Sequence, residues 1–152
     1  MTHRVFLLTA GLALSSSAYA AEHSVPCNTL PEAVQQHSKS LLEPGTTVKG
    51  CVKDVSDGKT TYEMELRTPK GSKDVTFNPQ GDLLEIEQQV DPATLPPPVA
   101  AAFAKAATGG KLGKVESLTR QGKLISYESR IERGGKHREV AFSPDGASMK
   151  AD

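Results

Sequence analysis

The sequence predicts an α+β fold of two tandem modules, each with one helix packed on a four-stranded antiparallel sheet. The first observation is a repeat, because three separated landmarks return sixty-five residues later along the chain. The landmarks and their counterparts are Leu30-Pro31 with Leu95-Pro96, Tyr62-Glu63 with Tyr127-Glu128, and Val75 to Gly81 with Val140 to Gly146. The second observation is that, within each copy, a segment of helical periodicity is followed by segments of alternating periodicity.

A helix is expected at the start of each copy. In the first, Pro31 suits the first helical turn, and Thr29 or Asn28 can cap it. Pro44-Gly45 ends this helix, and Gly109-Gly110 ends its counterpart. The apolar positions at helical spacing are Val34, Leu41 and Leu42 in the first copy and Val99, Phe103, Ala106 and Ala107 in the second.

Four strands are expected after each helix. Tyr62, Met64 and Leu66 alternate with charged residues, which is typical of a half-buried strand. The expected strands lie near residues 48–55, 62–67, 74–77 and 84–87, and near residues 112–118, 127–132, 140–142 and 147–150.

An antiparallel sheet with one apolar face has to bury that face. We therefore expect each helix to cover its own sheet, with Phe77 and Phe142 buried and no β-layer shared by the two halves. The side chains expected beneath the helices are Tyr62, Met64, Leu66, Val75, Phe77 and Ile86 in the first module and Tyr127, Ile131, Val140 and Phe142 in the second.

The N-terminus predicts export. Arg4 precedes an apolar run from Val5 to Leu14, and small residues then lead to a cleavage site after Ala20 or, as second choice, after Ala21. The run is too short to span a bilayer. We expect a signal peptide at 1–20, module 1 at 27–90, a Pro-rich linker at 91–98 and module 2 at 95–152. The product would be periplasmic or secreted, without stable membrane insertion.

The charge balance argues against a nucleic-acid partner. The chain has 18 basic and 18 acidic residues, and removal of Arg4 leaves 17 basic against 18 acidic, a net charge of −1. Such a chain lacks the basic footprint that binding to nucleic acid requires.

The two cysteines, Cys27 and Cys51, have two explanations. In an exported chain such a pair is typical of a disulfide. Reactive or metal-binding thiols are the alternative, but the spacing is not C-x-x-C and no pair of histidines accompanies it. These features favour the disulfide.

The run "YEMELRTPKGSKDVTFNPQGDLLEIE" resembles the PepSY-like module of small bacterial exported proteins, and "YESRIERGGKHREVAFSPDG" is a second match. "LPEAV" and "LPPPVAAAF" resemble the helix start of that module. The tandem arrangement is similar to beta-lactamase-inhibitor-like proteins. The resemblance implies binding or inhibition of an envelope protein, a hydrolase or peptidase, and it brings no catalytic residues.

No residue cluster predicts catalysis, a metal or a cofactor. His23, His37 and His137 lack metal-ligand spacing. The acidic residues Asp82, Glu85 and Glu87 lack the loop of known calcium sites and are better explained as a solvated strand face. There is no Gly-x-Ser-x-Gly turn.

Charged side chains of the strands should point away from the helices. The candidate binding residues are Glu63, Glu65, Arg67, Glu128, Arg130, Glu132 and Glu139. These charges either keep the face soluble or set the specificity of a partner. The edge strands could also accept an extended peptide, although their charges are typical of protection against unwanted pairing.

Together these observations predict a non-enzymatic exported binding or inhibitor-like protein that contacts an envelope protein or peptide through its sheet surfaces. A periplasmic small-molecule or ion sensor is the alternative, and it would need a concave pocket with convergent polar groups.

Overall fold

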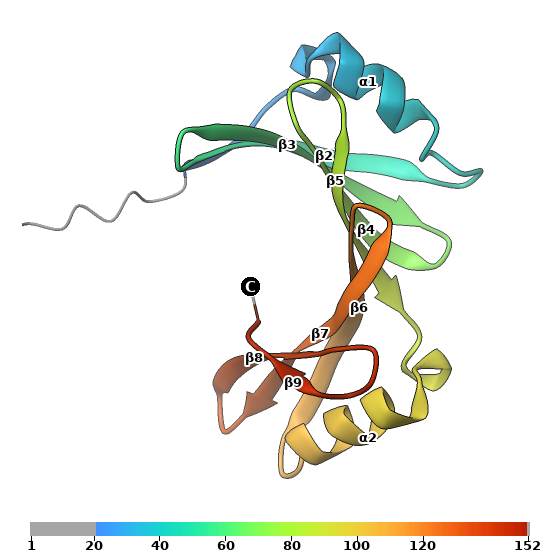
Figure 1. The fold of residues 1–152 in the computed structure, drawn as a ribbon, viewed down its shortest axis with the longest axis vertical. Helices are drawn as coiled ribbons and strands as arrows, with labels where there is room; N and C mark the ends of the chain where they lie inside the picture. The colour runs from blue at the N-terminus through green and yellow to red at the C-terminus, as the bar shows by residue number, and fades with distance from the viewer. Residues whose placement is uncertain (1–20, 152) are drawn as a thin grey trace, which may run out of the picture.

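The computed structural model describes residues 21–151, which form one nine-stranded antiparallel sheet and two α-helices (Figure 1). Each strand pairs with the next one in the sequence. The strands are β1 (Ala21–Ser24), β2 (Thr47–Ser56), β3 (Lys59–Thr68), β4 (Gly71–Phe77), β5 (Leu83–Val90), β6 (Lys111–Arg120), β7 (Lys123–Arg133), β8 (Lys136–Phe142) and β9 (Ser148–Met149). The helices are α1 (Glu32–Lys39) and α2 (Pro97–Ala106), with short 3-10 turns η1 (Cys27–Thr29) and η2 (Pro92–Thr94). The predicted signal peptide lies outside the described residues.

The α+β class and the repeated order of one helix and four strands are confirmed. The expectation that the halves share no β-layer is wrong, because β5 pairs with β6 from Glu85↔Arg120 to Val90↔Val115. Each module alone would leave a long strand edge with unpaired backbone groups, and joining the edges satisfies both of them.

Each module nevertheless keeps its own core beneath its own helix. In the first, Val34 of α1 is fully buried against a cluster that includes Val75 and Phe77. In the second, the rings of Phe103 and Phe142 meet edge to face with centroids 4.9 Å apart. The predicted burial of Phe77 and Phe142 is confirmed, and burying such a side chain stabilises the fold by about 1.5–3 kcal/mol.

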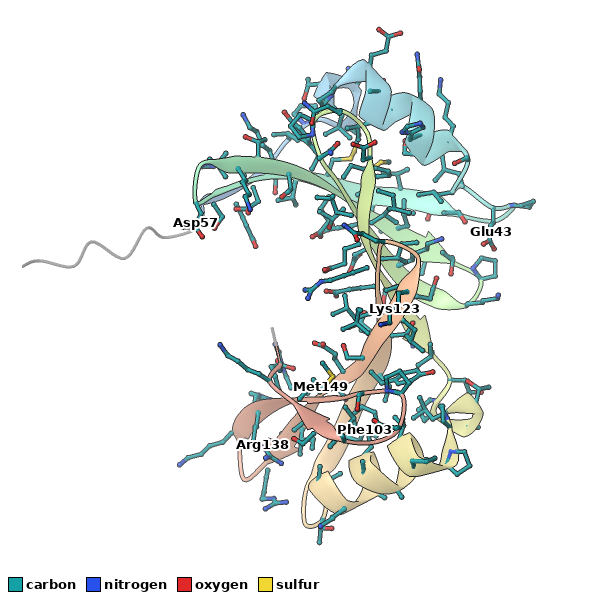
Figure 2. The ribbon with its side chains drawn as sticks, viewed as in Figure 1. Glu43, Asp57, Phe103, Lys123, Arg138 and Met149 are labelled. Atoms are coloured by element: carbon teal, nitrogen blue, oxygen red, sulfur yellow. A yellow bond between two sulfur atoms is a disulfide. The ribbon has the colours of Figure 1, made fainter. Side chains whose placement is uncertain are left out.

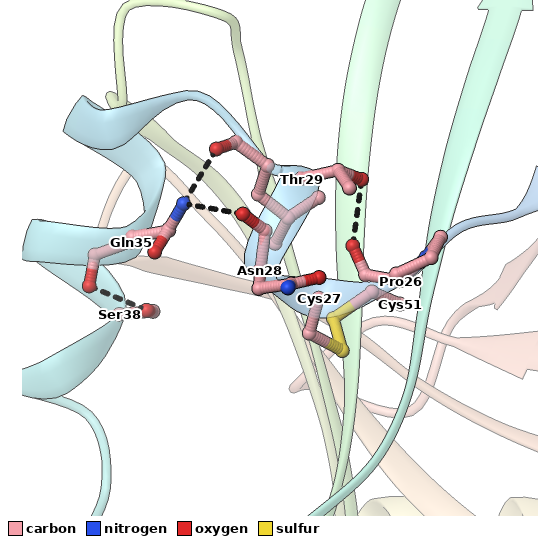
Figure 3. Close-up of a disulfide and its surroundings, with 8 residues drawn as sticks. Pro26, Cys27, Asn28, Thr29, Gln35, Ser38 and Cys51 are labelled. Carbon is pink, nitrogen blue, oxygen red and sulfur yellow. Dashed lines mark hydrogen bonds between the residues drawn. A yellow bond between two sulfur atoms is a disulfide. The ribbon is translucent and has the colours of Figure 1, made fainter.

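The first helix is shorter than the sequence predicts. It follows Pro31 without a side-chain cap, because Thr29 lies in η1 and donates its hydroxyl to the Pro26 carbonyl at 2.7 Å (Figure 3). The predicted cap by Thr29 or Asn28 is therefore wrong. The helix ends at Lys39, so Leu42 lies beyond the helical stripe and is 39% exposed, contrary to its predicted place in the core.

The second helix begins inside the proline-rich segment, at Pro97. Before it, Asp91 caps the turn η2 by accepting a hydrogen bond from the Ala93 N–H at 2.9 Å. This segment therefore combines a turn with the first turn of a helix, where proline's fixed φ is already suitable.

Cys27 and Cys51 are joined by a disulfide that ties η1 to β2, as predicted (Figure 3). The Val25 N–H donates to the Cys51 carbonyl at 2.9 Å just beyond β1. Strand β1 was not predicted, because its four residues carry no apolar alternation, and it forms by pairing with β2.

Candidate functional site: the helix-free face of the sheet

The sheet curves so that both helices lie outside the curve and the helix-free side lies inside it (Figure 1). We call this side the open face. Residue alternation decides which side chains reach it, since neighbours along a strand point to opposite sides. Met64 and Val75 are paired and buried beneath α1, so the next pair along the strands, Glu65↔Asp74, points to the open face.

Carboxylates form a strip across the middle of the open face. Cross-strand pairing places Glu65 opposite Asp74 and Asp74 opposite Glu87. Glu116 of β6 completes the group, because carboxylate oxygens of Asp74, Glu87 and Glu116 all lie within 4.8 Å of one another. We call Asp74, Glu87 and Glu116 the acidic strip. It spans the seam between the modules, so it exists only because β5 pairs with β6.

A glycine in β2, Gly50, makes room for the carboxylate of Glu65, which lies opposite Asp74 of the acidic strip. A β-carbon on Gly50 would lie 2.6 Å from Oε2 of Glu65. The glycine therefore lets the Glu65 carboxylate lie flat over the neighbouring strand.

Three carboxyl groups on the open face have raised pKa values. Burial, followed by the charges of Asp74 and Glu65, raises the pKa of Glu63 to about 7. Burial and the charge of Glu85 likewise raise the pKa of Glu87 to about 7. For Asp74, burial and the charge of Glu116 raise the pKa, and the Lys114 ammonium opposes them.

Basic side chains neutralise only part of this negative charge. Lys114 Nζ lies 2.6 Å from Glu116 Oε1 and donates to the Ser72 hydroxyl at 2.7 Å. Across the seam between β5 and β6, Arg120 Nε lies 2.5 Å from Glu85 Oε2. Within residues 21–151, no ion pair is formed by Glu63, Asp74 or Glu87, the groups with raised pKa values.

A cavity of about 600 Å³ opens between β5 and β8, and two residues of the acidic strip, Glu87 and Glu116, line it. Gly113 lies in a β6 irregularity there, and a β-carbon on it would lie 2.8 Å from the Arg130 carbonyl oxygen. The charged residues that line the cavity are Glu87, Lys114, Glu116, Glu128, Arg130 and Glu139. Charges of both signs thus converge on one concave region.

The strand registers place all seven candidate binding residues on the open face. Three of them, Glu128, Arg130 and Glu139, line the cavity, and Arg130 Nε lies 2.7 Å from Glu139 Oε1. Those on β3 are Glu63, Glu65 and Arg67, across the strip from the cavity, and Glu132 lies exposed toward the far end of β7. The structure does not bring all seven into one cluster.

Sequence reasoning missed Asp74, Lys114 and Glu116 as functional residues. Alternation along β4 does place Asp74 on the open face, but its meeting with Glu116 depends on the unforeseen seam. The trio considered for calcium is not brought together: Asp82 accepts a hydrogen bond from Asn78 Nδ2 at 2.8 Å in the β4–β5 turn, and Glu85 pairs with Arg120.

Among the residues described, neither helix has the length and hydropathy needed to cross a bilayer. No protein-family model matches the chain, and no curated protein matches it.

Solved structures share the fold. A DUF2874 family protein from Bacteroides ovatus matches with a TM-score of 0.64 and 19% identity, over 80% of this chain and 86% of that one. A Bacteroides eggerthii protein, provisionally described as periplasmic, matches with a TM-score of 0.64 and 18% identity, over 79% and 86%. A BLIP-like protein from Bacteroides fragilis matches with a TM-score of 0.59 and 23% identity, over 79% and 84%. DUF2874 is a PepSY-like family, so the predicted resemblance is confirmed at the level of the fold.

Proposed function

We propose that this chain is an exported, non-enzymatic binding protein that holds a protein partner against the open face. The contact is centred on the acidic strip and extends over the adjoining cavity. A basic side chain of the partner enters between Asp74 and Glu87, and the charges around the cavity set the register of the complex.

The observation that carries this proposal is that the half-buried carboxylates of Glu63, Asp74 and Glu87 form no ion pair with any of the residues described. Holding like charges together in a partly desolvated site is unfavourable for the isolated protein, as the raised pKa values of Glu63 and Glu87 express. A cation from a partner would relieve that repulsion, and complementary charge raises both specificity and the rate of association.

The remaining support comes from the chain's setting and its structural neighbours. The Cys27–Cys51 disulfide suits an oxidising compartment such as the periplasm. One structural neighbour is called BLIP-like, which agrees with a binding role, and another is provisionally described as periplasmic, which agrees with a place in the cell envelope.

The test compares recovery of envelope proteins by the wild type and by Asp74→Asn/Glu87→Gln. These substitutions keep side-chain shape and remove negative charge, so the partner should be recovered at least about tenfold less, the equivalent of one ion pair. Glu132→Gln is the matched control, because Glu132 lies exposed on the same face away from the strip. Equal recovery by all three proteins would contradict the proposal.

The second candidate is an ion sensor, which the convergence of three carboxylates within 4.8 Å favours. Calcium takes six to eight oxygen ligands, so it would need oxygens besides these. It would also have to displace Lys114, whose ammonium already lies 2.6 Å from Glu116. A calcium-dependent rise in melting temperature that Asp74→Asn removes would support the sensor, and no rise at millimolar calcium would dismiss it.

A further inference from the structure

The outer edge of β8 is mostly uncovered, although its counterpart in the first module is covered. Strands β4 and β8 occupy equivalent places sixty-five residues apart. The paired positions run from Lys73↔Gln88 to Phe77↔Leu83 on β4, but comprise only Ala141↔Met149 and Phe142↔Ser148 on β8. Along 136–140, no strand of the described chain pairs with this outer edge. Such an edge presents backbone donors and acceptors to an incoming strand.

The core beneath this edge lacks a side chain that the first module has. There, Val75 is paired with Ile86, which packs against the buried cluster. The counterpart of Val75 is Val140, and none of the residues that the structure describes pairs with it on the outer side. Val140 and Phe142 each remain 8% exposed, whereas Val75 and Phe77 are each 1% exposed. The first module thus shows what completes the second: a strand that carries an apolar side chain at the position of Ile86.

A groove lies at the position where that side chain would fit. A cavity of about 530 Å³ runs between α2 and β8. Ala102 and Ala106 line it from the helix, and Val140 and Phe142 line it from the sheet. Two alanines on the helix leave space for a branched apolar side chain above the two buried residues.

The charges of this groove select an acidic occupant. Lys105 of α2 and Arg138 of β8 both line it. Arg138 Nη2 donates to the Ala106 carbonyl at 3.5 Å, which keeps the guanidinium beside the end of α2 (Figure 2). The acidic lining residue, Glu139, already pairs with Arg130 at 2.7 Å. A carboxylate that enters here would meet two cations.

We propose that the β8 edge binds an extended segment of a partner protein, which adds to the sheet as a strand antiparallel to β8. Its direction follows from β5, where Ile86 lies opposite Val75 and Gln88 lies opposite Lys73. The segment therefore reads apolar-x-acidic, with its apolar side chain opposite Val140 and its acidic side chain opposite Arg138. This surface is separate from the open face and does not depend on the function proposed for that face.

The direct test is fluorescence anisotropy with a labelled decapeptide that has Ile-Lys-Glu at its centre and Thr and Ser elsewhere. It should bind the exported chain saturably. A peptide with Asp in place of the Ile, and one with the central order reversed to Glu-Lys-Ile, should each bind at least about tenfold more weakly. Absence of saturable binding, or equal binding of the three peptides, would overturn the proposal.

Two protein variants locate the contact. Arg138→Gln should weaken binding of the Ile-Lys-Glu peptide by about fivefold or more, and Lys73→Gln, at the equivalent place on the covered strand β4, should leave it unchanged. Bound peptide should slow hydrogen exchange of the amides at 136–140 and not at 73–77. If the amides at 136–140 are already protected without peptide and the chain sediments as a dimer, a second copy of the chain occupies the β8 edge and the proposal fails. Asp74→Asn/Glu87→Gln should bind this peptide normally, which separates this test from that of the open face.

Discussion

Gly81, in the turn after β4, lies directly against Ala33 of α1, so that a β-carbon on the glycine would be 2.8 Å from the Ala33 carbonyl carbon. Sixty-five residues on, Gly146 stands in the same relation to the Pro98 carbonyl oxygen, again at 2.8 Å. Both glycines have positive φ, +85° and +86°. The repeat in the sequence is thus also a repeat of close contacts, in which each hairpin turn closes against the first turn of its own helix.

Replacing Gly81 by alanine should therefore destabilise the protein by about 2–3 kcal/mol, since backbone strain and a steric clash act together. Gly58→Ala is the matched control, because Gly58 also has positive φ but a β-carbon there would meet nothing within 4 Å. Gly58→Ala should lower the free energy of unfolding by about 1 kcal/mol, from the backbone conformation alone. Urea unfolding of both variants measures the difference, and equal losses would show that the turn does not close tightly on the helix.

Loss of the disulfide should lower the free energy of unfolding by about 3 kcal/mol, because the bond closes a ring that spans 24 residues of sequence separation. The double variant Cys27→Ser/Cys51→Ser is compared with the wild type in urea, with and without reductant. Reductant should destabilise the wild type to the level of the variant and leave the variant unchanged. Indifference of the wild type to reductant would mean that the bond is absent.

The free energy of unfolding should fall as the pH rises from 5 to 8. The folded protein holds protons on Glu63 and Glu87 up to a pKa of about 7, whereas the unfolded chain releases them near 4.5. The folded state therefore binds more protons between these values, and unfolding becomes easier as they are lost.

The double variant Glu63→Gln/Glu87→Gln should flatten this dependence and be more stable than the wild type at pH 8. We expect about 1 kcal/mol per substitution, a reduced value because both carboxyls are half-exposed and screened. Chemical denaturation at several pH values measures it, with Glu132→Gln as control. Parallel pH profiles for wild type and double variant would be incompatible with raised pKa values of Glu63 and Glu87 on the open face.

The corrected position of Leu42 can be tested by truncation. Val34→Ala should lower the free energy of unfolding by about 2 kcal/mol, because Val34 is completely buried between α1 and the sheet. Leu42→Ala should change it by about 0.5 kcal/mol or less, although it removes more carbon atoms, because Leu42 lies on the surface. The opposite ranking in thermal or urea unfolding would restore Leu42 to the core.

Local patterns in the sequence were sufficient to predict the strands and hairpins of each module. Alternation predicts β3 and β4, and the repeated Pro-containing turns predict the hairpins, because these features depend on neighbouring residues. The seam between β5 and β6 could not be predicted in this way, since it joins Glu85 to Arg120 across the linker and α2. The acidic strip was missed for the same reason, and the cap at Thr29 was misjudged because Thr29 bonds backward to Pro26.

The most direct test of a binding role for the open face is site-specific photocrosslinking in cells that export the full chain. A photoreactive residue replaces Thr76, which points into the open face beside Asp74, or Gln36, which is exposed on α1. We predict that one envelope protein crosslinks at position 76 and not at position 36, and that Asp74→Asn/Glu87→Gln removes the product. Crosslinking at position 36 alone, or at both positions alike and regardless of the charge substitutions, would contradict the account.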